Sequence, residues 1–355
     1  MEFSLILATA ADSWKVAQRA ESLGFDAIWF EDSQMVAADP FVAMAAAAMQ
    51  TRRIRLGTGV CIPSNRIPPV TANMLATLNA LAPGRIDWGV GTGFSARRAM
   101  GLPALGVRTL ERNIETVQGL LAGETVECTF GSTTRPIRFL NPERDLVNTR
   151  DPIPCHVAAN GPRARDVAAR TGSHWIAIYA NDGQAAADLT AMDAAYRAAG
   201  RNPGEYRKTI FTFGALVRDG ETYDSPRVRA QAGPTSAMVL HNLMETQYGD
   251  LGTGGIGDEQ LLAAYRALYA AYTPADARYL TLHRGHALFL REDEAPLIDG
   301  EFIRQVSCSG TLDELVARVR ALRDLGYTGV SFLVLPHLTD SLDDWARVKE
   351  RVESG

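Results

Sequence analysis

The sequence predicts an α/β fold, a (β/α)8 TIM barrel with a long insertion after its seventh strand. Short apolar runs alternate with longer stretches of helical periodicity, which is typical of βα units around a parallel sheet. Eight such units can be counted along the chain. The 355 residues, of which 46% are hydrophobic, are enough to bury one large core. We therefore expect a single domain over residues 1–355.

The first half of the chain supplies four units. Continuous apolar runs predict buried strands, and helices are expected where apolar residues recur every three or four positions or where proline stands near a first turn. The expected strands are Phe3–Ala8, Ala27–Phe30, Ile54–Val60 and Arg85–Val90, and the expected helices are Asp12–Leu23, Pro40–Met49, Pro69–Leu81 and Leu110–Leu121. A polar excursion of short strands is expected over Thr125–Phe139.

The second half repeats this alternation. Thr311 and Glu314 form a predicted capping box, in which each side chain pairs with a backbone N–H of the other residue. The expected strands are His156–Ala159, Trp175–Tyr179, Lys208–Val217 and Gly329–Leu335, and the expected helices are Arg163–Arg170, Ala185–Ala199, Leu312–Leu325 and Asp343–Val352.

A long segment, Arg218–Ser307, separates the seventh strand from the next barrel helix. It contains two predicted helices, Ser236–Gln247 and Glu259–Tyr272, and a glycine-rich hinge, Gly249–Gly257. Such excursions from a barrel commonly lie at the catalytic rim. We expect a lid or substrate wall, with a dimerisation arm as the alternative.

Composition excludes several classes of protein. A formal charge of −5 gives no general attraction to phosphate backbones or anionic lipid, so we expect neither nucleic-acid nor membrane partners. The four cysteines are widely spaced and predict neither a disulfide framework nor a zinc site. The beginning of the sequence lacks a basic signal region, and no apolar stretch is long enough for a bilayer, so a cytoplasmic location is expected.

Barrel enzymes place their active sites at the carboxyl ends of the strands. Glu31 and Asp32 are adjacent acids at the end of the second strand, and one of them should face the barrel axis. The alternative for either acid is a capping role in the following loop.

Glycines stand at the ends of the third and fourth strands, in Gly57-Thr58-Gly59-Val60-Cys61 and Gly91-Thr92-Gly93. Glycine there permits close backbone approach to a flat ligand, or a bulge, although a plain turn has the same composition. A lone cysteine such as Cys61 is more often a packed apolar residue than a nucleophile. Arg97 and Arg98 follow, and they could hold an anion or remain solvated.

The fifth strand runs into Ala159-Asn160-Gly161-Pro162-Arg163. Proline near a first helical position indicates a helix start, where free N–H groups form an anion site that commonly takes phosphate. Arg163 and Arg165 would strengthen it. An ordinary βα turn is the alternative, but the agreement with the other strand ends favours an anion site.

The six histidines offer little metal-ligand spacing, apart from His283 and His286. No third ligand is evident near this pair, so no metal is predicted.

These residues resemble the bacterial luciferase-like superfamily of flavin- and F420-dependent oxidoreductases, in the branch similar to methylenetetrahydromethanopterin reductase. The likeness rests on the stretches AESLGFDAIWFED, RIRLGTGVCIP, VTANMLATLNALAPGRIDWGVGTG, VAANGPRARDVAARTG and GTLDELVARVRALRDLGYTGVSFLV. It implies a barrel that holds FMN or the deazaflavin F420 at the strand ends.

The resemblance also assigns roles to residues. Gly59-Val60, often joined by a non-proline cis peptide, would support the ring beside Cys61, and Asp32 would lie near it. The phosphate would lie at Ala159, Asn160, Gly161 and Pro162, with Gly91, Thr92 and Gly93 lining its ribityl side.

One position departs from the pattern, because many members carry histidine where this chain has Ser33. Serine does not titrate near neutral pH. Proton transfer would then fall to Asp32, Glu31 or a histidine elsewhere such as His286, to the substrate or to water.

The first functional expectation is an FMN-dependent monooxygenase that uses reduced flavin from a separate reductase, and O2, on a small organic substrate. The first alternative is an F420-dependent dehydrogenase or reductase that transfers hydride. The second is a non-catalytic flavin-binding accessory protein. The resemblance also suggests a homodimer.

Overall fold

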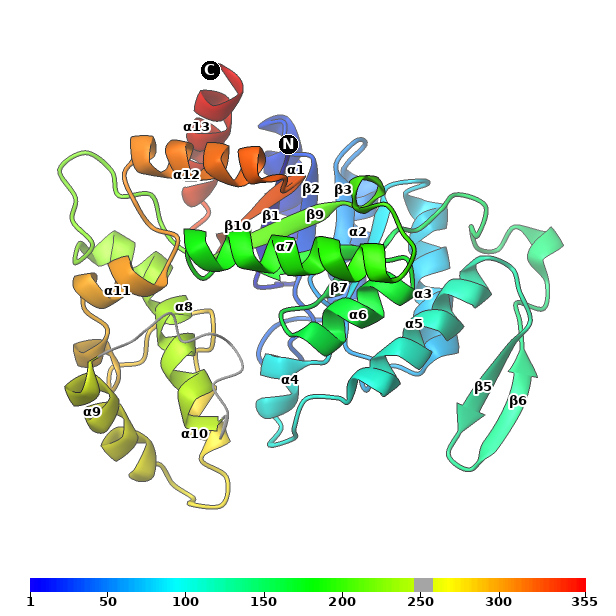
Figure 1. Cartoon of the computed structure of the whole chain (residues 1–355), viewed down its shortest axis with the longest axis horizontal. Coiled ribbons are helices and arrows are strands. Elements are labelled where there is room, and N and C mark those ends of the chain that lie inside the picture. The colour runs from blue at the N-terminus through cyan, green and yellow to red at the C-terminus, as the bar shows by residue number, and fades with distance from the viewer. Residues whose placement is uncertain (246–257) are drawn as a thin grey trace.

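The computed structural model describes residues 1–245 and 258–355 as a closed barrel of eight parallel strands with helices around it (Figure 1). Around the barrel the order is β1-β10-β9-β8-β7-β4-β3-β2, so the first and last strands pair and close the sheet. The predicted (β/α)8 fold is confirmed. The strands are β1 (Glu2–Leu7), β2 (Ala27–Phe30), β3 (Arg55–Thr58), β4 (Ile86–Val90), β7 (Cys155–Ala158), β8 (His174–Ile178), β9 (Lys208–Thr212) and β10 (Gly329–Val334).

The outer helices bury their apolar faces against the strands in one large core. The predicted capping box is present, with the Thr311 side chain accepting from the Glu314 backbone and the Glu314 side chain accepting in return. The helices are α1 (Trp14–Ser22), α2 (Pro40–Gln50), α3 (Pro68–Leu81), α4 (Phe94–Arg98), α5 (Val107–Leu121), α6 (Pro162–Arg170), α7 (Asp182–Ala198), α12 (Leu312–Leu325) and α13 (Ser341–Glu353). Helix α4, which directly follows the glycine segment after β4, was not expected.

The inside of the barrel is filled by side chains that alternate with those facing the helices. Trp29 takes much of this space, and a Cβ atom at Gly57 would lie 2.4 Å from its ring. Glycine at position 57 is therefore what allows the indole to fit. The buried members of this inner cluster are Ile6, Trp29, Ile176, Phe211, Leu333 and Leu335.

The polar excursion after α5 is a two-stranded antiparallel hairpin outside the barrel, as expected, formed by β5 (Val126–Phe130) and β6 (Thr133–Ile137). Figure 1 shows it projecting away from the barrel at the right of the view.

The insertion forms a helical lobe beside the barrel, at the left of Figure 1, with an apolar core of its own. The chain leaves and re-enters the barrel side by side, because Leu216 pairs with Gly310. Helix α8 starts well before the expected Ser236. The earlier start was not predicted because Gly233 and Pro234, which usually interrupt helices, lie inside the helix. The helices are α8 (Pro226–Glu245), α9 (Glu259–Ala270), α10 (Tyr279–Leu282) and α11 (Gly300–Val306).

The expected hinge, Gly249–Gly257, lies outside the described residues. Within residues 1–245 and 258–355, no helix is both long enough and apolar enough to span a membrane.

Candidate active site

Four segments predicted to form the site lie next to one another around the mouth of the barrel. They follow β2, β3, β4 and β7, which are consecutive neighbours in the sheet. We call this set the mouth arc, and it comprises Glu31–Asp32, Gly59–Cys61, Gly91–Gly93 and Ala159–Arg163. The topology thus brings together residues that the sequence spreads over more than a hundred positions.

The segment after β3 is held by backbone hydrogen bonds to both neighbouring strands. The Gly59–Val60 peptide is cis, as the resemblance implied. The Gly59 N–H donates to the Phe30 carbonyl at 2.7 Å, and the Cys61 N–H donates to the Gly89 carbonyl at 2.8 Å. Val60 is partly exposed and packs on the inner cluster, so its side chain lies between the barrel interior and the mouth.

Cys61 contributes to this segment through its backbone. Its carbonyl accepts from the Gly91 N–H at 3.0 Å. The residue is 4% exposed and packs in the large core between the strands and the outer helices. Burial raises the pKa of the thiol, so Cys61 is not a thiolate nucleophile.

The glycines after β3 and β4 stand where a side chain would collide with neighbouring residues. A Cβ atom at Gly91 would lie 2.9 Å from Cγ2 of Val60, and one at Gly59 would lie 2.9 Å from Cβ of Trp29. Gly93 has φ +77° and starts α4, a conformation that favours glycine. Thr92, between Gly91 and Gly93, is partly exposed at the mouth.

The segment after β7 is the start of α6. Gly161 is the N-cap without a side-chain hydrogen bond, and Pro162 occupies the first turn. A Cβ atom at Gly161 would meet nothing within 4 Å, so space is open in front of the free N–H groups. Arg163 is exposed beside it, whereas Ala159 is buried and its carbonyl accepts from Trp175 Nε1 at 2.9 Å. An anion can therefore approach Gly161 and Arg163, and Ala159 only fixes the turn.

The other predicted arginines are engaged with protein groups. Arg165 bonds the Asn160 carbonyl and pairs with Asp188 at 2.8 Å. Arg97 donates to the Pro103 carbonyl at 2.6 Å. Arg98 stacks on Phe94 with its guanidinium carbon 3.6 Å from the ring centre.

Glu31 and Asp32 differ sharply in environment, as the alternation of a strand predicts. Trp29 faces the barrel interior, so Glu31, two residues later, continues on that side and is partly exposed at the mouth. Dehydration by the surrounding protein raises the pKa of Glu31 to about 8. Glu31 can thus exchange a proton near neutral pH.

Asp32 is buried and is bound to a partner that the sequence analysis missed. Arg66 Nη1 lies 2.7 Å from Asp32 Oδ2, and the same guanidinium contacts Asp39. Burial raises the pKa of Asp32, and the Arg66 charge opposes that shift. With its carboxylate bonded to Arg66, Asp32 positions the loop after β3 and is less available than Glu31 for proton transfer.

Two further residues absent from the predicted site connect the loops. Gln34 Nε2 donates to the Ala96 carbonyl at 2.9 Å, and Asn65 Nδ2 donates to Gln34 Oε1 at 2.7 Å. They tie the loops after β2 and β3 to α4. The sequence signal for Asn65 is a polar run, Ser64-Asn65-Arg66, between a strand and a proline-started helix, and Gln34 lies two residues after Asp32.

His286, the third candidate for proton transfer, lies in the insertion. It is 5% exposed, and its ring packs against the rings of His241 and His283. Burial lowers the pKa of His286 well below its usual value, and the neighbouring histidines add to this effect. His241 is the third histidine that sequence spacing did not bring to this pair.

Comparison with known proteins identifies the family to which these segments belong. Residues 7–329 match the luciferase-like monooxygenase family. An F420-dependent glucose-6-phosphate dehydrogenase of Beutenbergia cavernae is 36% identical over 174 residues, which is 44% of this chain and 49% of that protein. An F420-dependent hydroxymycolic acid dehydrogenase of Mycobacterium tuberculosis is 33% identical over 217 residues, covering 57% of this chain and 58% of that protein. The chain thus spans about half the length of these curated relatives.

Solved structures share the fold over nearly the whole chain. The coenzyme F420-dependent tetrahydromethanopterin reductase of Methanopyrus kandleri superposes with a TM-score of 0.70 at 21% identity, covering 99% of this chain and 98% of that one. The oxygenating constituent of 3,6-diketocamphane monooxygenase of Pseudomonas putida, in complex with FMN, gives a TM-score of 0.62 at 17% identity, covering 99% and 98%.

The family match extends over most of the chain and contains six of the eight barrel strands and the whole mouth arc, while β1 and β10 lie at its two edges. The chain belongs to the luciferase-like monooxygenase family of oxidoreductases.

Proposed function

We propose that this protein is an F420-dependent oxidoreductase that moves hydride between F420 and a small hydroxyl- or carbonyl-bearing substrate. The observation that carries this proposal is that two relatives above 30% identity are both named as F420-dependent dehydrogenases. This supports the first alternative of the sequence analysis over its leading expectation.

The mouth arc fits a flat ring with an anionic tail. Partly exposed apolar side chains surround the opening, and two of them, Val60 and Phe213, rest on the inner cluster. The start of α6 offers free N–H groups and the exposed Arg163 to a phosphate. Glycine at positions 59 and 91 lets the segments after β3 and β4 pack closely on Trp29 and Val60.

When bound, F420 supplies the chemistry of hydride acceptance and donation. The chain contributes binding through Gly59–Val60, Gly91–Gly93 and Asn160–Pro162. Oxidation of a hydroxyl group also releases a proton. The Glu31 carboxylate is suited to accept this proton because its pKa of about 8 is close to neutral pH. Arg66 pairs with the Asp32 carboxyl at 2.7 Å, which fixes the loop that carries Gly59–Val60.

The expected FMN-dependent monooxygenase would take reduced FMN from a separate flavin reductase. This expectation rests on structural likeness at 17% identity, which shows the fold alone. A non-catalytic accessory role has no supporting relative among the proteins described above. The homodimer and the lid role of the insertion stay predictions.

The test is a fluorescence titration of the purified full chain with F420 and, separately, with FMN, followed by turnover assays. We expect F420 to bind at least tenfold more tightly than FMN. We also expect a panel of sugar phosphates and secondary alcohols to contain a substrate that reduces F420 without O2 uptake.

Two results would contradict the proposal. Tighter binding of FMN, with an oxygenated product formed from substrate, O2 and reduced FMN, would restore the monooxygenase. Binding of either cofactor with no turnover across the panel would favour the accessory role.

A further inference from the structure

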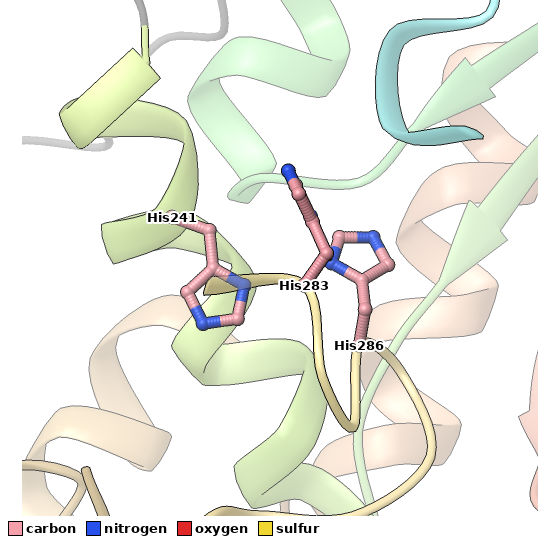
Figure 2. Close-up of side chains that lie close together, drawn as sticks. All are labelled: His241, His283 and His286. Atoms are coloured by element: carbon pink, nitrogen blue, oxygen red, sulfur yellow. The ribbon is translucent and has the colours of Figure 1, made fainter. Parts of the chain in front are cut away.

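Three buried histidines from the insertion meet in one place, and none of them belongs to the segments that form the mouth arc. His241 extends from α8, and His283 and His286 extend from the loop that follows α10 (Figure 2). They are 1%, 6% and 5% exposed. One ring nitrogen of each lies within 4.8 Å of one nitrogen of both others. We call these residues the histidine cluster.

The hydrogen bond of His241 determines which of its nitrogens is free. Its Nε2 lies 3.1 Å from Oε2 of the buried Glu294. That oxygen also accepts from Tyr265 Oη at 2.9 Å and pairs with Arg291 at 2.9 Å. A carboxylate only accepts, so Nε2 carries the proton and Nδ1 keeps a lone pair. His241 Nδ1 is buried and has no hydrogen-bond partner in the described part of the chain.

His283 is oriented in the same way. Its Nε2 lies 3.0 Å from Oε1 of Glu245, so its Nδ1 also keeps a lone pair. This Nδ1 faces Nδ1 of His286 at 3.4 Å, and His286 Nε2 is buried with no hydrogen-bond partner among the residues that the structure describes.

A hydrogen-bond network alone does not account for this arrangement. Buried polar atoms in proteins are almost always paired, and an unpaired one destabilises the fold. Here two imidazoles each leave a nitrogen unpaired within one small cluster. A cation would accept the lone pair of the unpaired His241 Nδ1 together with those of the facing Nδ1 atoms of His283 and His286.

We propose that His241, His283 and His286 bind a divalent transition-metal ion of the zinc class. Zinc binds imidazole at about 2.0–2.1 Å, which in a tetrahedron separates two ligand nitrogens by about 3.4 Å. The Nδ1 atoms of His283 and His286 are already 3.4 Å apart. Glu294 and Glu245 then act as the outer carboxylates that commonly orient metal-binding histidines.

The protonation state of the cluster agrees with this assignment. Metal ions bind the neutral imidazole. Burial lowers the pKa of both His241 and His286, so these rings are neutral near pH 7. The proposed site does not depend on which cofactor the barrel binds.

The test uses the full-length chain, freed of metal with a chelator and then dialysed against Zn2+. We expect about one tightly bound Zn2+ per chain by elemental analysis, and a rise in melting temperature when Zn2+ is added. Co2+ should give the intense visible absorption of a tetrahedral site.

His286→Leu is the decisive variant because this histidine has no carboxylate partner and its loss leaves no acidic group unpaired. We expect Zn2+ affinity to fall at least tenfold and the Zn2+-dependent rise in melting temperature to disappear. Without metal, the variant should melt at the same temperature as the wild-type protein or above it, since a buried unpaired nitrogen is removed.

The matched control is His337→Leu, which removes an exposed histidine that follows β10. This control should bind Zn2+ like the wild-type protein. The proposal is overturned if wild-type protein binds no Zn2+ at micromolar concentration, or if His286→Leu binds as much as the wild type. Equal loss in both variants would identify surface binding and would also overturn it.

Discussion

The mouth arc and the surroundings of the histidine cluster are built from different chemical groups. The mouth arc presents backbone groups and glycines, with Glu31 as its main titratable side chain and Arg163 as its exposed cation. The insertion instead buries a dense set of ionisable groups, in which Glu294 serves His241, Tyr265 and Arg291 at once.

This difference indicates a division of roles. A surface of backbone groups suits a ligand that binds reversibly, because few charged side chains must be desolvated when the ligand binds. A buried network of charges and imidazoles suits a permanent role, since removing one member leaves the others uncompensated. Substitutions in the two regions should therefore affect different measurements.

The largest effect is expected in the insertion. Glu294→Gln removes the charge shared by His241, Tyr265 and Arg291, and we expect it to lower the free energy of unfolding by about 3 kcal/mol. Glu292→Gln, at an exposed neighbouring position, is the control and should change it by less than about 0.5 kcal/mol. Chemical denaturation measures both. Equal stability of the two variants would contradict the view that Glu294 organises the insertion.

In the mouth arc, Glu31→Gln should lower turnover about a hundredfold while cofactor affinity changes little, because a general acid–base group is lost. Asp12→Asn, an exposed carboxyl after β1, is the control and should keep full turnover. Normal turnover in the Glu31→Gln variant would show that the substrate or water, and not Glu31, carries out the proton transfer.

The same substitution has a signature in stability. The pKa of Glu31 is about 8 in the folded protein, against an ordinary 4.5, so the folded state favours the protonated carboxyl. Its contribution to stability is full below about pH 4.5 and is lost as pH rises through 8. Melting curves should therefore show Glu31→Gln gaining on the wild-type protein between pH 5 and pH 9. Parallel curves would show that Glu31 is not dehydrated.

A smaller effect is expected where the glycine backbone of β4 meets β3. A Cβ atom at Gly89 would lie 2.1 Å from the Thr58 carbonyl oxygen, so Gly89→Ala must displace the backbone beside Gly59. We expect a loss of about 2 kcal/mol in stability. Gly106→Ala, where a Cβ atom meets nothing within 4 Å, should be close to neutral. No difference between the variants would show that this strand contact is adaptable.

The smallest effect is expected at the start of α6. Gly161→Asp places a negative charge where a phosphate would bind, and we expect cofactor affinity to fall about tenfold, equivalent to ~1.4 kcal/mol. Gly161→Ala adds a methyl group to open space and should bind normally. Cofactor titration distinguishes the two. Unchanged affinity in Gly161→Asp would exclude this helix start as the phosphate site.

The contrast between the regions also explains what could be predicted from sequence. The barrel strands and the Thr311–Glu314 capping box depend on local periodicity and local hydrogen bonds, which a sequence displays directly. The mouth arc could be predicted because barrel topology places consecutive strand ends together. The pairing of Arg66 with Asp32 could not, since it joins two loops through side-chain directions that no periodicity encodes.

The insertion was harder to predict for the same physical reason. The first turns of α8 were not predicted because Gly233 and Pro234 have low helix propensity. The helix forms there because the buried packing of these residues outweighs that propensity. His241 was not associated with His283 and His286 because the contact depends on how α8 packs against a loop that follows much later in the chain.

The Arg98–Glu245 pair joins the two regions, with Nη1 and Oε2 3.7 Å apart. Arg98 ends α4, which begins at the last glycine of the mouth arc, and Glu245 also holds His283. The pair is a direct side-chain contact between helix α4 and a carboxylate that bonds the histidine cluster. Thermodynamic reciprocity then requires that, if metal strengthens cofactor binding by some factor, cofactor strengthens metal binding by that same factor.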